Sequence, residues 1–569
     1  MAAVDAIILM GATGSSAVLA FLTVWPHRLD GFPRSVVLIS WMLAVLAIIA
    51  TRFSGHFFRS MALYGDLVGR PGASPAILVG AGPFLGELVH SLFDRPDLRI
   101  RPVAVIDLEG KAGGSRLSGI PVRGTLADLE SMATRRRAGL IILALPPWLP
   151  DRAGVVARAA AVSAHLGLAL RVVPTLRESL EGEVGGLVPR PADPNDLLNR
   201  RPAEIDLEAA SAYLTGARVL VTGASGSIGS ELCRQVAGLA PRLLVLLSNE
   251  ENGLYELELE LRRSLPGQAM AVVVADIRDR AKMARVFNDL RPDVVFHAAA
   301  HKHVPLMELE PDEAVKTNIA GTRNVAELAV ACKVKRFVFI STDKAVNPSS
   351  VMGASKRVAE HIIRSMHGNP GETRLCSVRF GNVLGSKGSV VPIFEEQIAH
   401  GRPLTITHPE MTRYFMTIPE AARLVIQAGA MTQGGEVFAL DMGEPVKIID
   451  LAKNLARLKG LDPDRDLRFE FIGVRPGEKL YEELLTAPEL RTTTKHSRVF
   501  VARPDAVDRN RLMRDLRELE RLGAAVEPAM IVAKLHEMVP GYRAGGLFRA
   551  PPVKAESKVS RRLRVVNRA

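Results

Sequence analysis

Cysteine and aromatic residues are scarce in this chain of 569 residues, and each scarcity excludes a class of protein. The three cysteines, Cys233, Cys332 and Cys376, lie far apart in apolar surroundings. They form no disulfide framework or metal-binding pattern, so we expect reduced core thiols in a domain that faces the cytosol. Aromatic residues make up 5%, and the chain carries no zinc-finger, helix-turn-helix or RNA-binding signature. We therefore expect no nucleic acid partner.

Acidic residues are fewer than basic ones, with 61 Asp and Glu against 73 Lys and Arg, for a formal net charge of +12. Such an excess attracts nucleic acid, anionic lipid or anionic small molecules. With nucleic acid set aside, the charge favours a membrane surface and phosphorylated ligands. The last segment, 542–569, loses its hydrophobic periodicity and gathers Lys and Arg, which predicts a disordered basic tail. Contact of this tail with anionic lipid and the absence of any partner are both open.

Two long apolar runs lie at the N-terminus, at 4–25 and 35–53. Each approaches the length needed to cross a bilayer core of about 30 Å, and a short segment with Pro and Gly joins them. A cleaved signal peptide fits less well, because no basic segment precedes the first run and a second run follows. Residues 1–55 are therefore predicted to form two transmembrane helices. Arginines beyond the second run place the remaining chain, by a modest bias, in the cytoplasm.

Short apolar runs alternate with helical stretches between residues 75 and 180, which predicts a small doubly wound α/β domain. Gly80, Gly82 and Gly86 follow its first strand in the pattern of a nucleotide-binding turn. No catalytic pattern follows them, so nucleotide binding and a structural or regulatory role both stay open. Residues 181–206 are rich in Pro, Asn and Asp and are predicted to be a linker.

The main domain, 207–541, opens with the segment RVLVTGASGSIG. A buried strand is predicted to end at a tight turn, with a helix beginning near Ser227. Gly223 permits the turn, Gly226 lets a pyrophosphate approach the backbone, and Gly229 lets helix and strand pack closely. The helix N-terminus adds unpaired N–H groups. We therefore expect a dinucleotide cofactor, bound by Thr222, Gly223, Ser225, Gly226, Ser227, Ile228 and Gly229.

Further strands and helices alternate after this turn and predict a Rossmann-type parallel sheet, with the ligand crevice at the carboxyl ends of the strands. Acidic residues shortly after the second strand favour NAD, and NADP remains the alternative. Asp276 and Ile277 follow the third strand and are expected beside adenine. Ala298 and Ala299, in PDVVFHAAA, are small enough to let the cofactor lie against the backbone.

The chain contains six segments in this order: TGASGSIG, HAAAHKHVPLME, STDKAV, MGASK, RFGNVLGSKGSVVP and RPGEK. They resemble the extended short-chain dehydrogenase/reductase superfamily. More narrowly, the chain is similar to the membrane-bound nucleotide-sugar 4,6-dehydratases of bacterial polysaccharide biosynthesis, typically those that act on UDP-N-acetylglucosamine. The resemblance covers nearly all of 206–541. The chain departs from the long members of that family in showing only two predicted membrane spans, because they usually carry more.

The resemblance implies an NAD-dependent lyase that oxidises C4 of the sugar, eliminates water across C5 and C6, and returns hydride to C6. Such an elimination needs an acid and a base side by side. Asp343 and Lys344 are adjacent, just beyond a predicted strand end. As the base, Lys344 must be neutral, which requires a lowered pKa, and as the acid, Asp343 requires a raised one. The family assigns the same roles, and the alternative is an ion-paired surface turn.

Met352 stands four residues before Lys356, where the superfamily usually has a Tyr that oxidises the sugar. Methionine accepts no proton, so C4 oxidation needs another acceptor. The long dehydratases resemble this chain in having Met there. We expect Asp343, through Thr342 or a water, to accept the O4 proton. Lys356 is expected to hold the nicotinamide ribose, and Thr342 to position O4.

The nucleotide end of the substrate is expected at five residues. Arg475 and Glu478, in RPGEK, match the family's motif, which implies contacts to the diphosphate and to the uridine ribose. Arg413 is a second basic candidate there, or else a helix cap. Asn382 is expected to contact a phosphate or the sugar, and Lys302 to line the sugar pocket. The histidines on either side of Lys302 have no evident third partner, so we expect no metal.

The leading hypothesis is therefore a multi-pass protein of the bacterial inner membrane with a cytoplasmic catalytic domain. Its expected partners are a UDP-sugar and membrane lipid, and the superfamily implies a homo-oligomer. One alternative is a UDP-sugar 4-epimerase, which needs the same C4 oxidation but no acid and base for C5 and C6. Another is a catalytically silent, NAD-responsive membrane scaffold. The adjacent Asp343 and Lys344 favour dehydration.

Overall fold

A computed structural model of the chain describes residues 39, 42–43, 72–110, 114–146, 148–174, 188–198, 206–367, 373–485, 492–502 and 507–543. Nearly all of the predicted membrane hairpin, most of the predicted linker and all but the start of the basic tail lie outside these residues. Within the described part of the chain, no helix is both long and apolar enough to cross a membrane. The chain divides into two compact units, Met1–Pro150 with Val162–Ala192 and Asp151–Ala161 with Asp193–Ala569.

The first unit is built on a five-stranded sheet of order β2-β1-β5-β6-β7. Its strands are β1 (Ser74–Gly80), β2 (Ile100–Asp107), β5 (Leu140–Ala144), β6 (Ala169–Val172) and β7 (Arg190–Pro191). All pairings are parallel except that of β7, at the edge. The helices along this part of the chain are α3 (Pro83–Asp94), α4 (Leu129–Arg135) and α5 (Arg152–Leu166). β5 is entirely buried, as expected for a strand inside a parallel sheet.

The second unit centres on a nine-stranded sheet of order β10-β9-β8-β11-β12-β13-β18-β22-β21. Seven strands are parallel: β8 (Arg218–Thr222), β9 (Leu243–Ser248), β10 (Met270–Val274), β11 (Val294–His297), β12 (Arg336–Ile340), β13 (Arg374–Arg379) and β18 (Val437–Leu440). β22 (Val499–Ala502) and β21 (Thr492–Thr493) extend the sheet in antiparallel pairing. The strand order reverses between β8 and β11, and such a switch point is where doubly wound sheets bind ligands.

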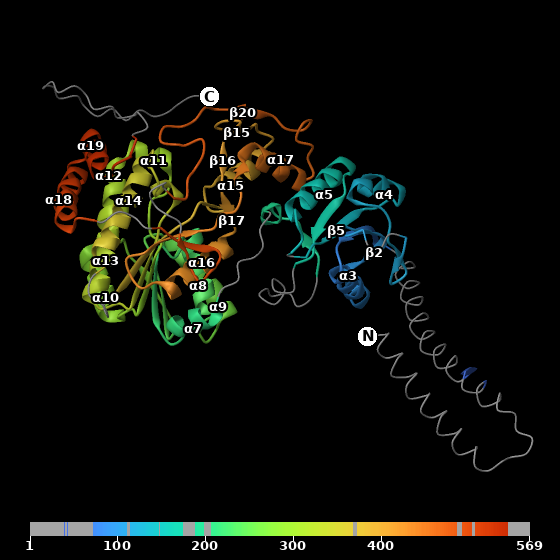
Figure 1. The fold of residues 1–569 in the computed structure, drawn as a ribbon, viewed down its shortest axis with the longest axis horizontal. Coiled ribbons are helices and arrows are strands. Elements are labelled where there is room, and N and C mark those ends of the chain that lie inside the picture. The colour runs from blue at the N-terminus through green and yellow to red at the C-terminus, as the bar shows by residue number, and fades with distance from the viewer. Residues whose placement is uncertain are drawn as a thin grey trace, which may run out of the picture. The chain divides into compact units, whose positions relative to one another are not determined.

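Helices cover both faces of this sheet (Figure 1). The first face carries α7 (Leu207–Leu214), α8 (Ser227–Ala237), α9 (Glu251–Ser264) and α16 (Ile418–Met431). The second face carries α10 (Arg280–Leu290), α13 (Thr322–Ala331) and α14 (Val351–Ser365). Val219 and Val221 of β8 belong to the first core, whereas Leu220 belongs to the second, because successive side chains of a strand point to opposite faces. The predicted Rossmann-type α/β fold is confirmed.

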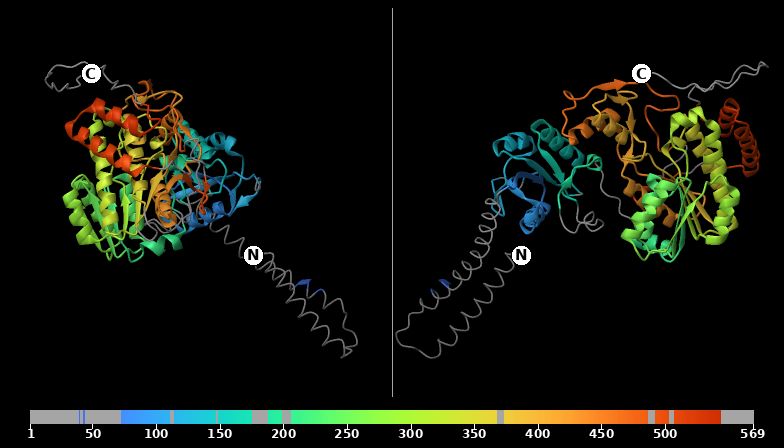
Figure 2. Two further views of the ribbon diagram at one scale, coloured as in Figure 1. Left: turned by 60° about the vertical axis from the view of Figure 1, so that its left-hand side comes forward. Right: turned by 180° about the vertical axis from the view of Figure 1, so that it is seen from behind.

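A smaller part of the second unit holds three two-stranded sheets, in the upper part of Figures 1 and 2. They pair β14 (Asn382–Val383) with β17 (Phe415–Met416), β15 (Leu404–Ile406) with β20 (Phe469–Phe471), and β16 (Thr412–Arg413) with β19 (Val446–Lys447). Two helices, α15 (Val390–Ala399) and α17 (Ile448–Leu458), share a separate core with these strands. Phe394, Leu404 and Leu455 are fully buried in it.

The C-terminal helices α18 (Arg509–Ala525) and α19 (Pro528–Met538) return to the large sheet's second side. They share a core with α11 (Val304–Leu309), α14 and the π-helical segment Val315–Gly321, which follows α12 (Pro311–Ala314). All three cysteines are free thiols: Cys233 and Cys376 are buried and Cys332 is partly exposed.

Candidate active site

The glycine turn joins β8 to α8, since the strand ends at Thr222 and the helix begins at Ser227. Gly223 has a φ of 67°, and a Cβ there would lie 2.7 Å from the backbone nitrogen of Ala299. A Cβ on Gly229 would collide with the carbonyl oxygen of Gly223. Only glycine fits these two positions, so the backbone can pass close to whatever occupies the space above the turn.

Two cavities meet at this turn. The larger has a volume of about 500 Å³ and is lined by the turn and by residues just beyond β11, β12 and β13. The smaller, of about 190 Å³, lies beyond the ends of β9 and β10. Both are lined by Gly223, Gly226 and Ala298. A small cavity and a larger one joined across a glycine turn suit a dinucleotide, with adenosine in the small part.

The predicted cofactor residues divide between these cavities. Ser227, Ile228 and Gly229 line the larger one, together with Lys356. The smaller one is lined by Ser225, Asp276, Ile277 and Ala299, with the Glu250 carboxylate nearby. Thr222 lines neither: it is buried, and its Oγ1 lies 2.7 Å from Nδ1 of His297.

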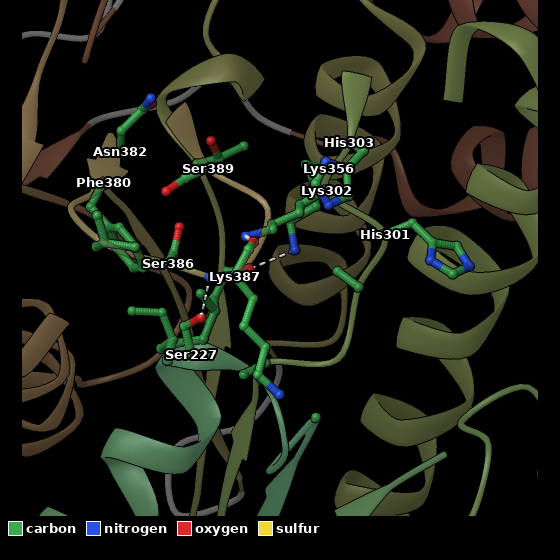
Figure 3. Close-up of a pocket in the computed structure, with 18 of the residues that line it drawn as sticks. Ser227, His301, Lys302, His303, Lys356, Phe380, Asn382, Ser386, Lys387 and Ser389 are labelled. Atoms are coloured by element: carbon green, nitrogen blue, oxygen red, sulfur yellow. Dashed lines mark hydrogen bonds between the residues drawn. The ribbon is translucent and has the colours of Figure 1, made fainter. Parts of the chain in front are cut away.

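A loop from the smaller part of the unit lies against the glycine turn (Figure 3). The Lys387 backbone N–H donates to Ser227 Oγ at 3.1 Å, and Lys302 Nζ donates to the Lys387 carbonyl oxygen at 2.7 Å. Lys302 therefore lines the larger cavity, and its ammonium group also binds the loop backbone, while its place in the sugar pocket stays a prediction. Sequence reasoning did not single out this loop as part of the site.

The predicted acid and base directly follow β12. Thr342 and Lys344 line the larger cavity, and Asp343 between them is fully buried. Oδ1 of Asp343 accepts hydrogen bonds from Thr342 Oγ1 at 2.9 Å and from Lys344 Nζ at 3.0 Å. Its other oxygen, Oδ2, has no hydrogen-bond partner among the described residues. The burial of Asp343 rules out the surface turn considered as the alternative.

The surroundings of Lys344 differ from the expectation. Nζ lies 3.3 Å from Asn382 Oδ1 and 3.4 Å from Glu482 Oε1, in addition to its contact with Asp343. Burial lowers the pKa of Lys344, but the Asp343 and Glu482 carboxylates together outweigh burial and raise it overall. The lowered pKa expected from the sequence is therefore wrong for this structure. Asp343 is the larger of the two opposing charges, and the second is Glu482, which carries no sequence signal beyond following the RPGEK segment.

Lys356 and Met352 lie one helical turn apart on α14, and both line the larger cavity. Lys356 Nζ donates to the Ile340 carbonyl oxygen at 2.6 Å and lies 4.1 Å from the centre of the Phe339 ring. Burial lowers the pKa of Lys356 to about 7, against the opposing effect of Glu360.

Of the residues expected at the nucleotide end of the substrate, only some line the two cavities. Asn382 lines the larger cavity. Arg413 is buried, and its Nη1 donates to the carbonyl oxygens of Thr412 and Leu480 at 2.7 and 3.3 Å. It is not among the described residues that line the two cavities, so a role at the nucleotide stays a prediction.

Arg475 is exposed and Glu478 is partly buried, and neither is among the described residues that line the two cavities. The loop that carries them is nevertheless hydrogen-bonded to the segment that directly follows Asp343 and Lys344. Ser349 Oγ donates to the Gly477 carbonyl oxygen at 2.8 Å, and Lys479 Nζ donates to that of Val346 at 2.9 Å. No cluster of three His, Cys, Asp or Glu side chains that could hold a metal was found in the described part of the chain.

Comparison with family models matches residues 219–504 to a family described as polysaccharide biosynthesis protein. The capsular polysaccharide biosynthesis protein CapD of Staphylococcus aureus is 44% identical over 469 residues, which cover 82% of this chain and 77% of that protein. The chain belongs to the polysaccharide biosynthesis protein family. A second model, described as a CoA-binding domain, matches residues 6–153. The predicted membership in a family of polysaccharide biosynthesis is thereby confirmed.

Two further relatives each match about half of this chain. The UDP-N-acetylglucosamine 4,6-dehydratase (inverting) of Campylobacter jejuni is 32% identical and covers 51% of this chain and 83% of that protein. The UDP-glucose 4-epimerase of Rickettsia conorii is 36% identical and covers 48% of this chain and 78% of that protein. The catalytic part is thus of the nucleotide-sugar dehydratase and epimerase type.

Proposed function

We propose that the protein dehydrates a UDP-N-acetylhexosamine, with UDP-N-acetylglucosamine as the first candidate, to its 4-keto-6-deoxy form for bacterial surface polysaccharide. The observation that carries this proposal is the pair of Asp343 and Lys344, whose Oδ1 and Nζ lie 3.0 Å apart at the cavity wall. Elimination across C5 and C6 needs an acid and a base together, whereas inversion at C4 does not. The relative named as a 4,6-dehydratase supports the same reaction.

The two joined cavities fit NAD. Gly223 and Gly229 let the strand, the turn and α8 pack tightly, and Gly226, Ser227 and Gly229 at the N-terminus of α8 line the larger cavity, where the first N–H groups of the helix can bind a diphosphate. Glu250 lines the smaller cavity, where a carboxylate favours the ribose hydroxyls of NAD over the extra phosphate of NADP, which is the alternative cofactor. Lys356 would hold the nicotinamide ribose. When bound, NAD supplies a hydride acceptor for C4 and a hydride donor for C6.

Proton movements are assigned to three residues. Thr342 Oγ1 lies between the cavity and Asp343, so it can receive the O4 proton while passing its own proton to Asp343 Oδ1. Asp343, now protonated and buried behind Thr342, can give this proton back through Thr342 Oγ1 to the departing C6 hydroxyl, which leaves as water. Lys344, as a neutral amine, takes the proton from C5 after the C4 ketone has acidified it, and returns a proton to C5 when hydride adds to C6. The two protons are therefore handled by adjacent groups of one chain segment.

A UDP-sugar 4-epimerase is the second candidate, favoured by the relative of that name. It would need a proton acceptor at O4 but no partner for C5 and C6. Met352 stands where such enzymes of this superfamily use Tyr, and it cannot accept a proton. A catalytically silent scaffold would need neither a buried Asp343 nor a lysine beside it.

The test is to incubate the full-length protein with UDP-N-acetylglucosamine and NAD and to follow the sugar by NMR. We expect a new C6 methyl signal together with a C4 ketone, and their loss in a Lys344→Met variant by about 100-fold or more in rate. A product with inverted C4 and an intact C6 hydroxyl would establish the epimerase instead. An unchanged sugar would favour the scaffold.

A further inference from the structure

Lys344 lies between two carboxylates that come from different parts of the second unit. Its Nζ is 3.0 Å from Asp343 Oδ1 and 3.4 Å from Glu482 Oε1. The exposed fractions of the three side chains are 21% for Lys344, 0% for Asp343 and 3% for Glu482. Carboxylates this deeply buried are costly without a counter-charge, and both share a single ammonium group.

Contacts of neighbouring residues place Glu482 beside Lys344. Arg413 donates to the carbonyl oxygen of Leu480, two residues earlier, and its Nε lies 3.9 Å from Glu482 Oε1. Lys479, at the start of the same segment, binds the carbonyl oxygen of Val346. The second carboxylate oxygen, Glu482 Oε2, has no hydrogen-bond partner among the described residues. A buried oxygen without a partner is unusual in native proteins and calls for an explanation in function.

We propose that Glu482 is a positioning residue for the reaction proposed above, on which this inference rests. It acts through Lys344: it shares the ammonium group with Asp343 and so decides the pH range in which Lys344 takes the substrate proton. The segment after RPGEK thereby supplies a part of the acid–base machinery, in addition to any contact of RPGEK with the nucleotide.

The charged groups that face Lys344 determine in which direction its pKa moves when Glu482 is made neutral. Asp343 and Glu482 favour the ammonium form, whereas burial and the Arg413 guanidinium oppose it. When Glu482 is made neutral, burial and Arg413 are opposed by one carboxylate only, so the pKa of Lys344 must fall. The base works as a neutral amine, so the acidic limb of kcat then moves to lower pH.

The experiment compares Glu482→Gln with wild type and with the matched control Glu483→Gln, all as full-length protein. Glu483 is the next residue, and its Oε2 contacts Asn347 and Lys479. Two quantities are measured against pH: kcat with UDP-N-acetylglucosamine, and the rate at which acetic anhydride labels Lys344, followed by peptide mass spectrometry. The labelling rate reports the unprotonated fraction of Lys344 without any need for turnover.

In Glu482→Gln we expect both the acidic limb of kcat and the labelling midpoint of Lys344 to move down by about 1–3 pH units. KM should change little, and Glu483→Gln should match wild type in both measurements. An unchanged labelling midpoint in Glu482→Gln overturns the proposal, even if activity is lost, because a merely structural role would produce that result.

This design distinguishes a failure of the proposed function from a failure of the proposed link between Glu482 and Lys344. If wild type forms no 4-keto product, the proposed function fails, and the labelling midpoints still uphold or overturn the link between Glu482 and Lys344. If Glu482→Gln does not fold, Glu482→Asp replaces it: the shorter side chain keeps the charge but withdraws it from Nζ. A smaller downward shift of the midpoint then supports the proposal, and a wild-type midpoint overturns it.

Discussion

At the scale of single residues, Lys344 and Lys356, two of the lysines that line the larger cavity, have pKa values shifted in opposite directions by their surroundings. The Asp343 and Glu482 carboxylates raise the pKa of Lys344, whereas burial lowers that of Lys356 to about 7. Lys344, which must accept a proton from C5, is therefore an ammonium ion in the resting enzyme. The proposed role of Glu482 is to set the pH range in which Lys344 loses that proton. Lys356, nearer neutrality, still has a hydrogen to donate to a ribose hydroxyl in either form.

His297, at the end of β11, gives a pH-dependent prediction at the same scale. Its ring nitrogens lie 2.7 Å from Thr222 Oγ1 and 3.0 Å from Thr322 Oγ1. Burial, followed by the charge of Lys356, lowers its pKa from 6.5 to about 3. Between these values the unfolded chain binds a proton that the folded protein does not, so the free energy of unfolding falls as pH falls through this window.

A His297→Gln variant is expected to be less stable than wild type by about 1–3 kcal/mol at pH 7, because buried hydrogen bonds are lost. It should, however, lose less further stability than wild type between pH 6.5 and pH 4. Urea unfolding at these pH values measures both effects, with the exposed His400→Gln as control. Equal pH slopes in His297→Gln and wild type would contradict the account.

At the scale of elements, α14 connects the sheet to the cavity. Met352, Lys356 and Glu360 are spaced four residues apart and so lie on one face of the helix. Glu360 is buried, accepts from Ser341 Oγ at 2.7 Å and forms a bidentate pair with Arg379 of β13. This pairing fixes the helix to β13 and to the end of β12, which positions Lys356 at the cavity wall.

Gly353 of α14 packs closely against the segment that contains Asp343 and Lys344, and this packing predicts how Gly353→Ala changes kcat. Alanine is the better helix former by about 1 kcal/mol, but its Cβ would collide with the Lys344 carbonyl oxygen. The turn must then shift, and we expect kcat to fall by about 10–100-fold. In the control Gly86→Ala on α3, the Cβ would meet nothing within 4 Å. That variant should keep wild-type kcat, and a Gly353→Ala variant that does the same would disprove the packing argument.

At the scale of the whole molecule, the described residues form two units with separate cores. Every group assigned to the chemistry belongs to the second unit. The dehydratase relative matches 51% of this chain and 83% of its own length. We therefore propose that the first unit, most of which lies in the range matched by the CoA-binding domain model, is dispensable for the proposed chemistry.

Deletion of residues 1–205 removes the first unit together with the segments of the second unit that precede residue 206. It is expected to leave kcat within a factor of about two, because both cores that flank the nine-stranded sheet lie beyond residue 206. We also propose that residues 1–55 anchor the protein in the bacterial inner membrane. The full chain should then sediment with membranes, and the shortened chain should stay in the supernatant. Loss of activity on deletion would give the first unit a part in catalysis, and a full chain in the supernatant would refute the anchor.

The sequence by itself determined the glycine turn, the α/β fold and the adjacency of Asp343 and Lys344. These features depend on local spacing: a strand, a turn that only glycine permits, a helix, and two neighbouring residues beyond a strand end. Only the tertiary structure decided the charge of Lys344, the burial of Arg413 and the exposure of Arg475. Coulomb interactions and burial depend on distances through space, and the contact between Lys344 and Glu482 joins segments that no local pattern relates.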